Sequence, residues 1–381
     1  MPQFDQNNCF TALHSVSTAM LIAVLLATSS TTAHADKLGD NLQTVWESLW
    51  DQRGSARLIS RWEQTVTFSV TGHDAASHRA LIVEAVQAAA DASGVAISEL
   101  AMPADSSQTA VLQFEIYKDA DLPDSQPCAT YIKASPTFGL ATVTVKLRPK
   151  DAWRCTYHEI MHAWGIPGHP SGKTVLSYFP YRSDQLMPMD RLMLKTWYLP
   201  AFKSGTTPIE ALALLSAQVA AQTDLDLPVE VAVQRSQEFN LQKIEELKAL
   251  ASGKGEVPAI VRRSGRASES VMLESQAWAG FYLGLAYMRG TIVARNVQTS
   301  IEWMSGSAVR GHSPSQLLLA RSLIRGLGIK KDVAAARGWL VLAAKSGNTA
   351  AQTELQALDN NALKNLVGSD NEKSLSVISQ P

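Results

Sequence analysis

The sequence predicts an α+β domain followed by an all-α helical repeat region. Three observations support this fold class: strand and helix patterns alternate between residues 62 and 164, the composition shifts to Ala, Leu and Gln after Pro200, and residue types recur 36 positions apart near the C-terminus. The chain has 381 residues and a mass of 41.2 kDa. A single hydrophobic core rarely extends beyond about 250–300 residues, so we expect about two or three structural units in this chain.

The first 35 residues have the features of a secretory signal. They carry one charged side chain, Asp5, and an apolar run over 19–27 that is followed by Ala33-His34-Ala35. We therefore expect cleavage after Ala35 and a periplasmic or secreted protein, although no Lys or Arg precedes the apolar run. A buried N-terminal helix is the alternative. No later segment reaches the roughly 20 consecutive apolar residues of a membrane helix, so no membrane span is expected in the mature chain.

Cleavage at this position would decide the state of the cysteines. It would remove Cys9 and leave Cys128 and Cys155, an even pair in an oxidising compartment where a disulfide persists. We expect these two cysteines to be bonded to each other. Two buried free thiols are the alternative.

Positive and negative side chains are almost equal in number. The chain has 34 Lys and Arg residues against 35 Asp and Glu residues, which leaves no strong electrostatic field. Nucleic acid is therefore not expected as a partner.

The α+β domain is expected over residues 36–205. Apolar residues at helical spacing predict a helix over 38–50, and the alternation that starts at Trp62 predicts a strand over 62–70. The further expected elements are a helix over 75–92, strands near 111–117 and 141–147, and a helix over 152–164 with Asp151 as its cap and Gly165 at its end.

The C-terminal half is expected to divide into three segments. Residues 206–270 form a helical connector with helices near 208–222 and 234–251, and its Gly/Arg/Ser-rich part over 252–267 predicts a linker. Residues 271–357 form the repeats. The polar tail over 358–381 is expected to be disordered.

An offset of 36 residues defines the internal repeat. The matched pairs are Arg289 and Arg325, Gly290 and Gly326, Val297 and Val333, Trp303 and Trp339, Ala308 and Ala344, Gly311 and Gly347, and Gln316 and Gln352. This period is typical of helix-turn-helix units that stack on their neighbours. With Leu283, Gly284 and Tyr287 in the first helix, the pattern resembles Sel-type repeats of the tetratricopeptide-like superfamily. The resemblance implies a protein partner for this region.

The candidate chemistry lies in one short segment, 155–169. His158 and His162 are four residues apart, so on a helix both rings face the same side and can bind one metal ion. Glu159 lies beside them, where its carboxylate can take a proton from a water at the metal. The pattern predicts a Zn²⁺ site, and a coincidence of structural histidines is the alternative.

The same segment resembles the metzincin metallopeptidases, whose pattern is His-Glu-x-x-His-x-x-Gly-x-x-His. The residues that match this pattern are His158, Glu159, His162 and Gly165. Gly168 occupies the position of the third histidine, and His169 follows one residue later. The resemblance implies that His169 is the third zinc ligand.

The resemblance continues downstream of the histidines. Residues 174–178 resemble the Met-turn of the family with Leu176 in place of Met, and Tyr178 falls where the family has the tyrosine that supports the transition state. The stretch from about 58 to 205 is also similar to a bacterial family of exported proteins of unknown function, many of which lack the histidines.

We interpret the chain as an exported zinc-dependent peptidase that hydrolyses peptide bonds with metal-activated water and Glu159 as general base. Its substrate would be a peptide or protein, including one associated with the cell wall, and the repeats would recruit it. The alternative is a catalytically inactive metzincin-like scaffold of the cell envelope that acts through its helical repeats.

Overall fold

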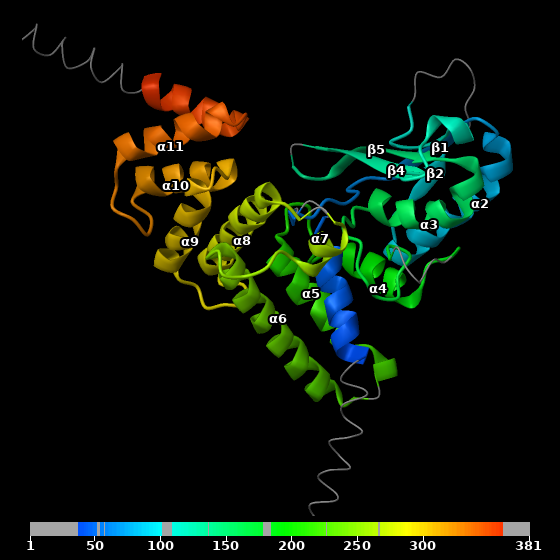
Figure 1. The fold of residues 1–381 in the computed structure, drawn as a ribbon, viewed down its shortest axis with the longest axis horizontal. Helices are drawn as coiled ribbons and strands as arrows, with labels where there is room; N and C mark the ends of the chain where they lie inside the picture. Colours follow the sequence, from blue (N-terminus) through cyan, green and yellow to red (C-terminus); the bar gives the residue numbers. More distant parts are fainter. Residues whose placement is uncertain are drawn as a thin grey trace, which may run out of the picture.

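The structure, a computed structural model, describes residues 37–51, 54–56, 58–100, 109–135, 137–177, 184–225, 227–265 and 267–360. The expected signal over 1–35 lies outside these residues, as does most of the expected disordered tail. Within the described part of the chain, no helix combines the length and the apolar character needed to cross a bilayer. The expected α+β domain followed by an all-α helical region is confirmed (Figure 1).

A five-stranded sheet with the order β2-β1-β3-β5-β4 frames the N-terminal domain. Four strands are parallel, and the edge strand β4 runs antiparallel to β5. The strands span Val66–Gly72 (β1), Ile97–Glu99 (β2), Leu112–Ile116 (β3), Cys128–Ala134 (β4) and Leu140–Leu147 (β5). The expected strand over 62–70 therefore starts four residues later, since Trp62 instead packs into the core and donates from its indole nitrogen to the Ala163 carbonyl at 2.9 Å.

Two helices, α2 (Ala75–Ser93) and α3 (Ala152–Ala163), pack against the sheet, and α4 (Pro188–Trp197) packs against α2. Figure 1 shows α3 directly below the sheet and α4 below α3, and α2 contacts both helices. The apolar stripe of α2 predicts this packing, because Ile82, Val86 and Ala89 are fully buried. These contacts hold α3 between the sheet strands β4 and β5 and helix α2.

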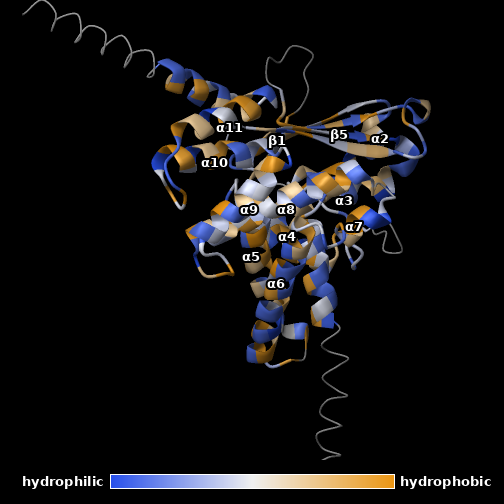
Figure 2. Ribbon diagram, turned by 60° about the vertical axis from the view of Figure 1, so that its left-hand side comes forward, coloured by the Kyte–Doolittle hydropathy of each residue, from blue (hydrophilic) through white to orange (hydrophobic). Residues whose placement is uncertain are grey.

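The connector consists of α5 (Pro208–Ala220), α6 (Val229–Ala251) and α7 (Ala259–Arg263). Hydrophobic and hydrophilic bands alternate along α5 and α6 in Figure 2, as expected for helices with one packed face. The linker expected over 252–267 contains α7, whose Ile260 and Val261 are buried in the core. This part of the linker prediction is corrected: a Gly- and Ser-rich composition does not prevent a short helix from packing.

The repeats form two helical hairpins, α8 (Glu269–Arg289) with α9 (Val297–Val309) and α10 (Ser313–Arg325) with α11 (Val333–Lys345), followed by a helix over 349–360. Gly290 and Gly326 both end a helix in the left-handed conformation, with φ of 79° and 70°. The Gln316 side chain donates to the Ala308 carbonyl at 3.0 Å, and its counterpart Gln352 donates to the Ala344 carbonyl at 3.3 Å. The 36-residue period is therefore a structural period.

The main core does not divide at the expected boundary between residues 270 and 271. One cluster of buried residues runs from Leu38 to Met304 and includes most of the buried face of α8, whereas a second cluster joins α9, α10 and α11 to the last helix. Leu358 packs against this second cluster, so the first residues of the expected tail end a helix instead. The first repeat helix thus belongs to the same core as the sheet domain.

Candidate metal centre

Helix α3 presents His158 and His162 one turn apart, on the side that faces a cavity of about 1090 Å³. The helix ends as predicted at Gly165, whose φ is +98°. A Cβ at this glycine would lie 2.0 Å from the Ser60 carbonyl oxygen, so no other residue fits without displacement. Asp151 precedes the helix without capping it and pairs instead with Arg148 and Arg154.

The Nε2 atoms of the three predicted ligands converge. His158 Nε2 lies 3.1 Å from His169 Nε2 and 3.2 Å from His162 Nε2, and His162 and His169 are 3.1 Å apart at the same atoms. Zinc–nitrogen bonds of about 2.0–2.1 Å in tetrahedral geometry place ligand nitrogens about 3.3–3.4 Å apart. The His triad therefore has almost the spacing that one zinc ion requires. Within the described part of the chain, these three histidines are the group of His, Cys, Asp or Glu side chains that lie close enough together to hold a metal ion.

Backbone carbonyls fix the orientation of two of these rings. His158 Nδ1 lies 2.9 Å from the Val175 oxygen, and His162 Nδ1 lies 2.7 Å from the Ile166 oxygen. A carbonyl only accepts, so we assign the proton of each neutral ring to Nδ1, which leaves an Nε2 lone pair directed at the centre of the triad. Burial lowers the pKa of His162, opposed by the hydrogen bond to Ile166. Lone pairs that face one another at this distance fit a bound cation.

Glu159 lies beside the triad and is almost fully buried. Its Oε2 accepts a hydrogen bond of 2.6 Å from the Thr130 hydroxyl on β4. Burial raises the pKa of the Glu159 carboxyl to about 7, and the bond from Thr130 acts in the opposite direction. Thr130 thus orients the predicted base, and no local sequence pattern indicates this contact, because the two residues are 29 positions apart.

The Cys128–Cys155 disulfide predicted from the sequence is present. It joins the first residue of β4 to α3, three residues before His158. The bond therefore ties the strand that carries Thr130 to the helix that carries Glu159.

The delayed third histidine has a steric explanation at Gly168. This residue donates from its backbone nitrogen to the Ser48 carbonyl at 2.9 Å, and a Cβ there would lie 2.3 Å from the Glu47 carbonyl oxygen. A histidine at position 168 would collide with the helix over 37–48. The third histidine of the triad consequently stands at position 169, and the structure brings His169 to His158 and His162.

Glu47 holds the loop that follows His169. Its carboxylate accepts hydrogen bonds from the Ser171 backbone nitrogen at 2.8 Å and from Arg263 of α7 at 2.7 and 3.1 Å. Burial raises the pKa of this carboxyl, but the bonds from Arg263, Gln43 and Ser171 outweigh burial and leave it below its usual value. One buried carboxylate therefore connects three segments around the metal centre.

Asp190 of α4 holds the segment that resembles the Met-turn. Its carboxylate accepts hydrogen bonds from the Thr174 hydroxyl and from the Val175 and Met187 backbone nitrogens, the latter two at 3.1 and 2.9 Å. Burial raises the pKa of Asp190 to about 6 against these bonds. Leu176, which stands in the place of Met, is fully buried. Tyr178 lies outside the described residues.

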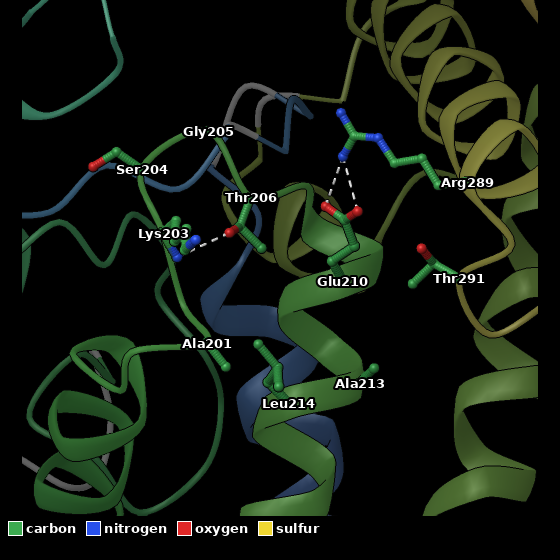
Figure 3. A pocket seen from close by; sticks show the side chains of 10 residues that line it. All are labelled: Ala201, Lys203, Ser204, Gly205, Thr206, Glu210, Ala213, Leu214, Arg289 and Thr291. Carbon is green, nitrogen blue, oxygen red and sulfur yellow. Dashed lines mark hydrogen bonds and ion pairs between the residues drawn. The ribbon is translucent and has the colours of Figure 1, made fainter.

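A second hollow of about 500 Å³ lies between the loop over 201–206, α5 and the end of α8 (Figure 3). Its main feature is an ion pair in which Arg289 contacts both oxygens of Glu210 at 2.8 and 2.9 Å. None of the predicted site residues lines this hollow. The ion pair joins the connector helix α5 to the repeat helix α8, and the hollow shares no residue with the candidate metal centre.

Two solved structures to which the chain is similar are Sel1-type repeat proteins. A Sel1 repeat protein from Oxalobacter formigenes is 25% identical, with coverage of 32% of this chain and 97% of that one and a TM-score of 0.22. The protective antigen c5321 of uropathogenic Escherichia coli, which has an SLR fold, is 17% identical, with coverage of 56% and 49% and a TM-score of 0.23. No protein-family model and no curated protein matches the chain.

Proposed function

We propose that this chain is an exported zinc-dependent peptidase with a metzincin-like catalytic domain. The observation that carries the proposal is the convergence of three Nε2 atoms at 3.1–3.2 Å beside a buried carboxylate, in a cavity large enough for several residues of a peptide. Unlike Glu47 and Asp190, Glu159 is buried with a single side-chain donor, Thr130, which costs stability and supports a catalytic use of this carboxylate.

The residues divide the catalytic work. A zinc ion bound by His158, His162 and His169 would supply a Lewis acid that polarises a carbonyl and acidifies water. Glu159, held through Oε2 by Thr130, keeps Oε1 free of hydrogen bonds from described residues, so this oxygen can take a proton from water and return it to the leaving amine.

The edge strand β4 offers a binding surface for an extended peptide. In the described part of the chain its outer edge has no strand partner, and Thr130, Ile132 and Ala134 line the cavity. A peptide that adds to this edge gains backbone hydrogen bonds that do not depend on its sequence. This arrangement supports a peptide or protein substrate, including one attached to the cell wall.

Two further parts of the proposal concern Tyr178 and the helical repeats. Tyr178 is proposed to donate a hydrogen bond to the oxyanion, as the resemblance implies. The helical repeats are proposed to bind a protein partner or to recruit the substrate, since stacked helical hairpins present extended surfaces.

The test compares the wild type with Glu159→Gln on a peptide library at equal zinc occupancy. Gln keeps an oxygen that can accept the Thr130 hydrogen bond but cannot take up the proton, so cleavage should fall about 100- to 10,000-fold while zinc stays bound. Equal cleavage by both proteins would assign the activity to a contaminant. No cleavage by either, with zinc fully bound, would support the scaffold function instead.

A further inference from the structure

Helix α8 of the first repeat forms part of the wall of the cavity above the histidines. Glu274 and Trp278 of this helix line the same cavity as His158 and Glu159. They are four residues apart, so both side chains lie on one face of the helix. The helical region therefore contributes directly to the space in which a substrate would bind.

The position of α8 against the sheet domain is fixed by buried contacts. Ser275 donates from its hydroxyl to the Gly54 carbonyl at 2.8 Å, and the Tyr282 hydroxyl donates to the Ala56 carbonyl. Gly54 has a φ of +80°, and a Cβ there would lie 2.2 Å from Ser275 Oγ. This close approach places Glu274 and Trp278 at a defined position in the wall.

Trp278 presents a rigid aromatic surface. Tyr282 stacks on its ring with centroids 5.4 Å apart, and His312 contacts it edge-on with centroids 4.4 Å apart. Trp278 is half-buried, and it lines the cavity. An immobilised indole with an open surface is a favourable site for a cationic group.

The charge of the lining favours a cation as well. Glu274 is exposed and forms no ion pair with a described residue. Among the described residues of the lining, Arg154 is the one Lys or Arg side chain, and it is paired with Asp151 at 2.5 Å. A basic side chain of a substrate would therefore meet an available carboxylate and no competing free cation from the described lining.

We infer that Glu274 and Trp278 form a subsite that selects a lysine or arginine side chain of the peptide. The aliphatic stem lies along the indole of Trp278, and the charged head pairs with Glu274. This inference rests on the proposed function, since it assumes that a peptide occupies the cavity at the histidines. It assigns substrate selection to the repeat helix in addition to any partner binding.

The test uses the full chain with Glu159→Gln, so that peptides bind without being cut. The probes are fluorescent, blocked hexapeptides of alanine with one lysine, norleucine or glutamate at each position in turn, and affinity is measured by anisotropy. At one position lysine should bind about 3- to 30-fold more tightly than norleucine. Glu274→Lys should reverse this preference toward glutamate, and Trp278→Leu should reduce it.

Glu269→Lys is the matched control, because it makes the same charge change on an exposed residue of α8 that does not line the cavity. It should leave the lysine preference unchanged. Equal shifts for Glu269→Lys and Glu274→Lys, equal affinity for lysine and norleucine at every position, or no binding of any probe would each overturn the subsite. Cleavage by the wild type without a charge preference would remove the subsite and keep the peptidase. A lysine preference without cleavage by the wild type would keep the subsite and remove the peptidase.

Discussion

Removal of the Cys128–Cys155 disulfide should destabilise the protein by an amount that follows from its position. The two residues are 27 positions apart, and the chain-entropy model gives about 3.5 kcal/mol at 25 °C for a loop of this length. The Cys128→Ala/Cys155→Ala double variant should show this loss in urea unfolding, with an equal or steeper dependence on denaturant concentration, because the unfolded chain without the cross-link exposes more surface. The measurement requires a chelator, because a bound metal would add its own stabilisation.

The disulfide also connects two parts of the metal centre, so its loss should reach the site. Thr130 lies two residues after Cys128, and His158 lies three residues after Cys155. The double variant should therefore bind zinc more weakly than the wild type. Two results would refute the reasoning: a stability loss below about 1 kcal/mol, far under the entropic value, or two thiols that react with an alkylating agent in the native, unreduced protein.

Three further predictions concern the loop that carries the third ligand. Arg263→Ala should weaken zinc binding about tenfold in a chelator competition, because Arg263 pairs with the buried Glu47. Arg262→Ala, on the same helix but paired with the exposed Glu256, should change zinc binding less than about twofold. Equal effects of the two substitutions would contradict the role of the buried network. Gly168→Ala should also lower zinc affinity, because the added Cβ would collide with the Glu47 carbonyl oxygen. An unchanged affinity would mean that the backbone at Glu47 can move away without displacing His169. In zinc-free protein, the stability advantage of the wild type over Glu47→Gln should be complete above the ordinary pKa of 4.5 and decline as the pH falls through the lowered folded value. An advantage that stays constant down to pH values near 3 would contradict this assignment.

Local patterns predicted the helix that carries two of the three candidate ligands. The helix with His158 and His162 follows from apolar spacing and from the glycine that ends it, both of which act within a few residues. The edge strand β4 was not predicted, because two adjacent residues of this strand, Tyr131 and Ile132, are both exposed, at 55% and 43%. The strand therefore shows no alternation of buried and exposed side chains. Strand β2 has three residues, too few for any periodicity.

The residues that position the site were missed for a different reason. Thr130 and Glu47 reach the centre from segments that are distant in sequence, 29 positions from Glu159 and 124 positions from Ser171. No local pattern distinguishes a threonine or a glutamate that will make such a contact. The displacement of the third histidine to position 169 likewise becomes understandable only once the helix over 37–48 is placed against Gly168.

The domain boundaries were predicted from composition and from the repeat period, but the main hydrophobic core extends across them. The Gly- and Ser-rich stretch over 252–267 contains Arg263, which reaches the buried Glu47. Helix α8 shares the pattern of the later repeats but packs on the sheet domain through Ser275 and Tyr282. A repeat period identifies which residues are equivalent, and it does not identify which neighbour each repeat contacts.

The most direct test of the metal centre is the zinc content of the purified full-length protein after dialysis, measured by mass spectrometry beside the His158→Ala and His169→Ala variants. The convergent nitrogens predict one zinc ion per wild-type chain, almost none in His158→Ala, and reduced occupancy in His169→Ala. Substoichiometric zinc in the wild type that does not rise on reconstitution, or equal zinc in all three proteins, would contradict the assignment of these histidines as ligands.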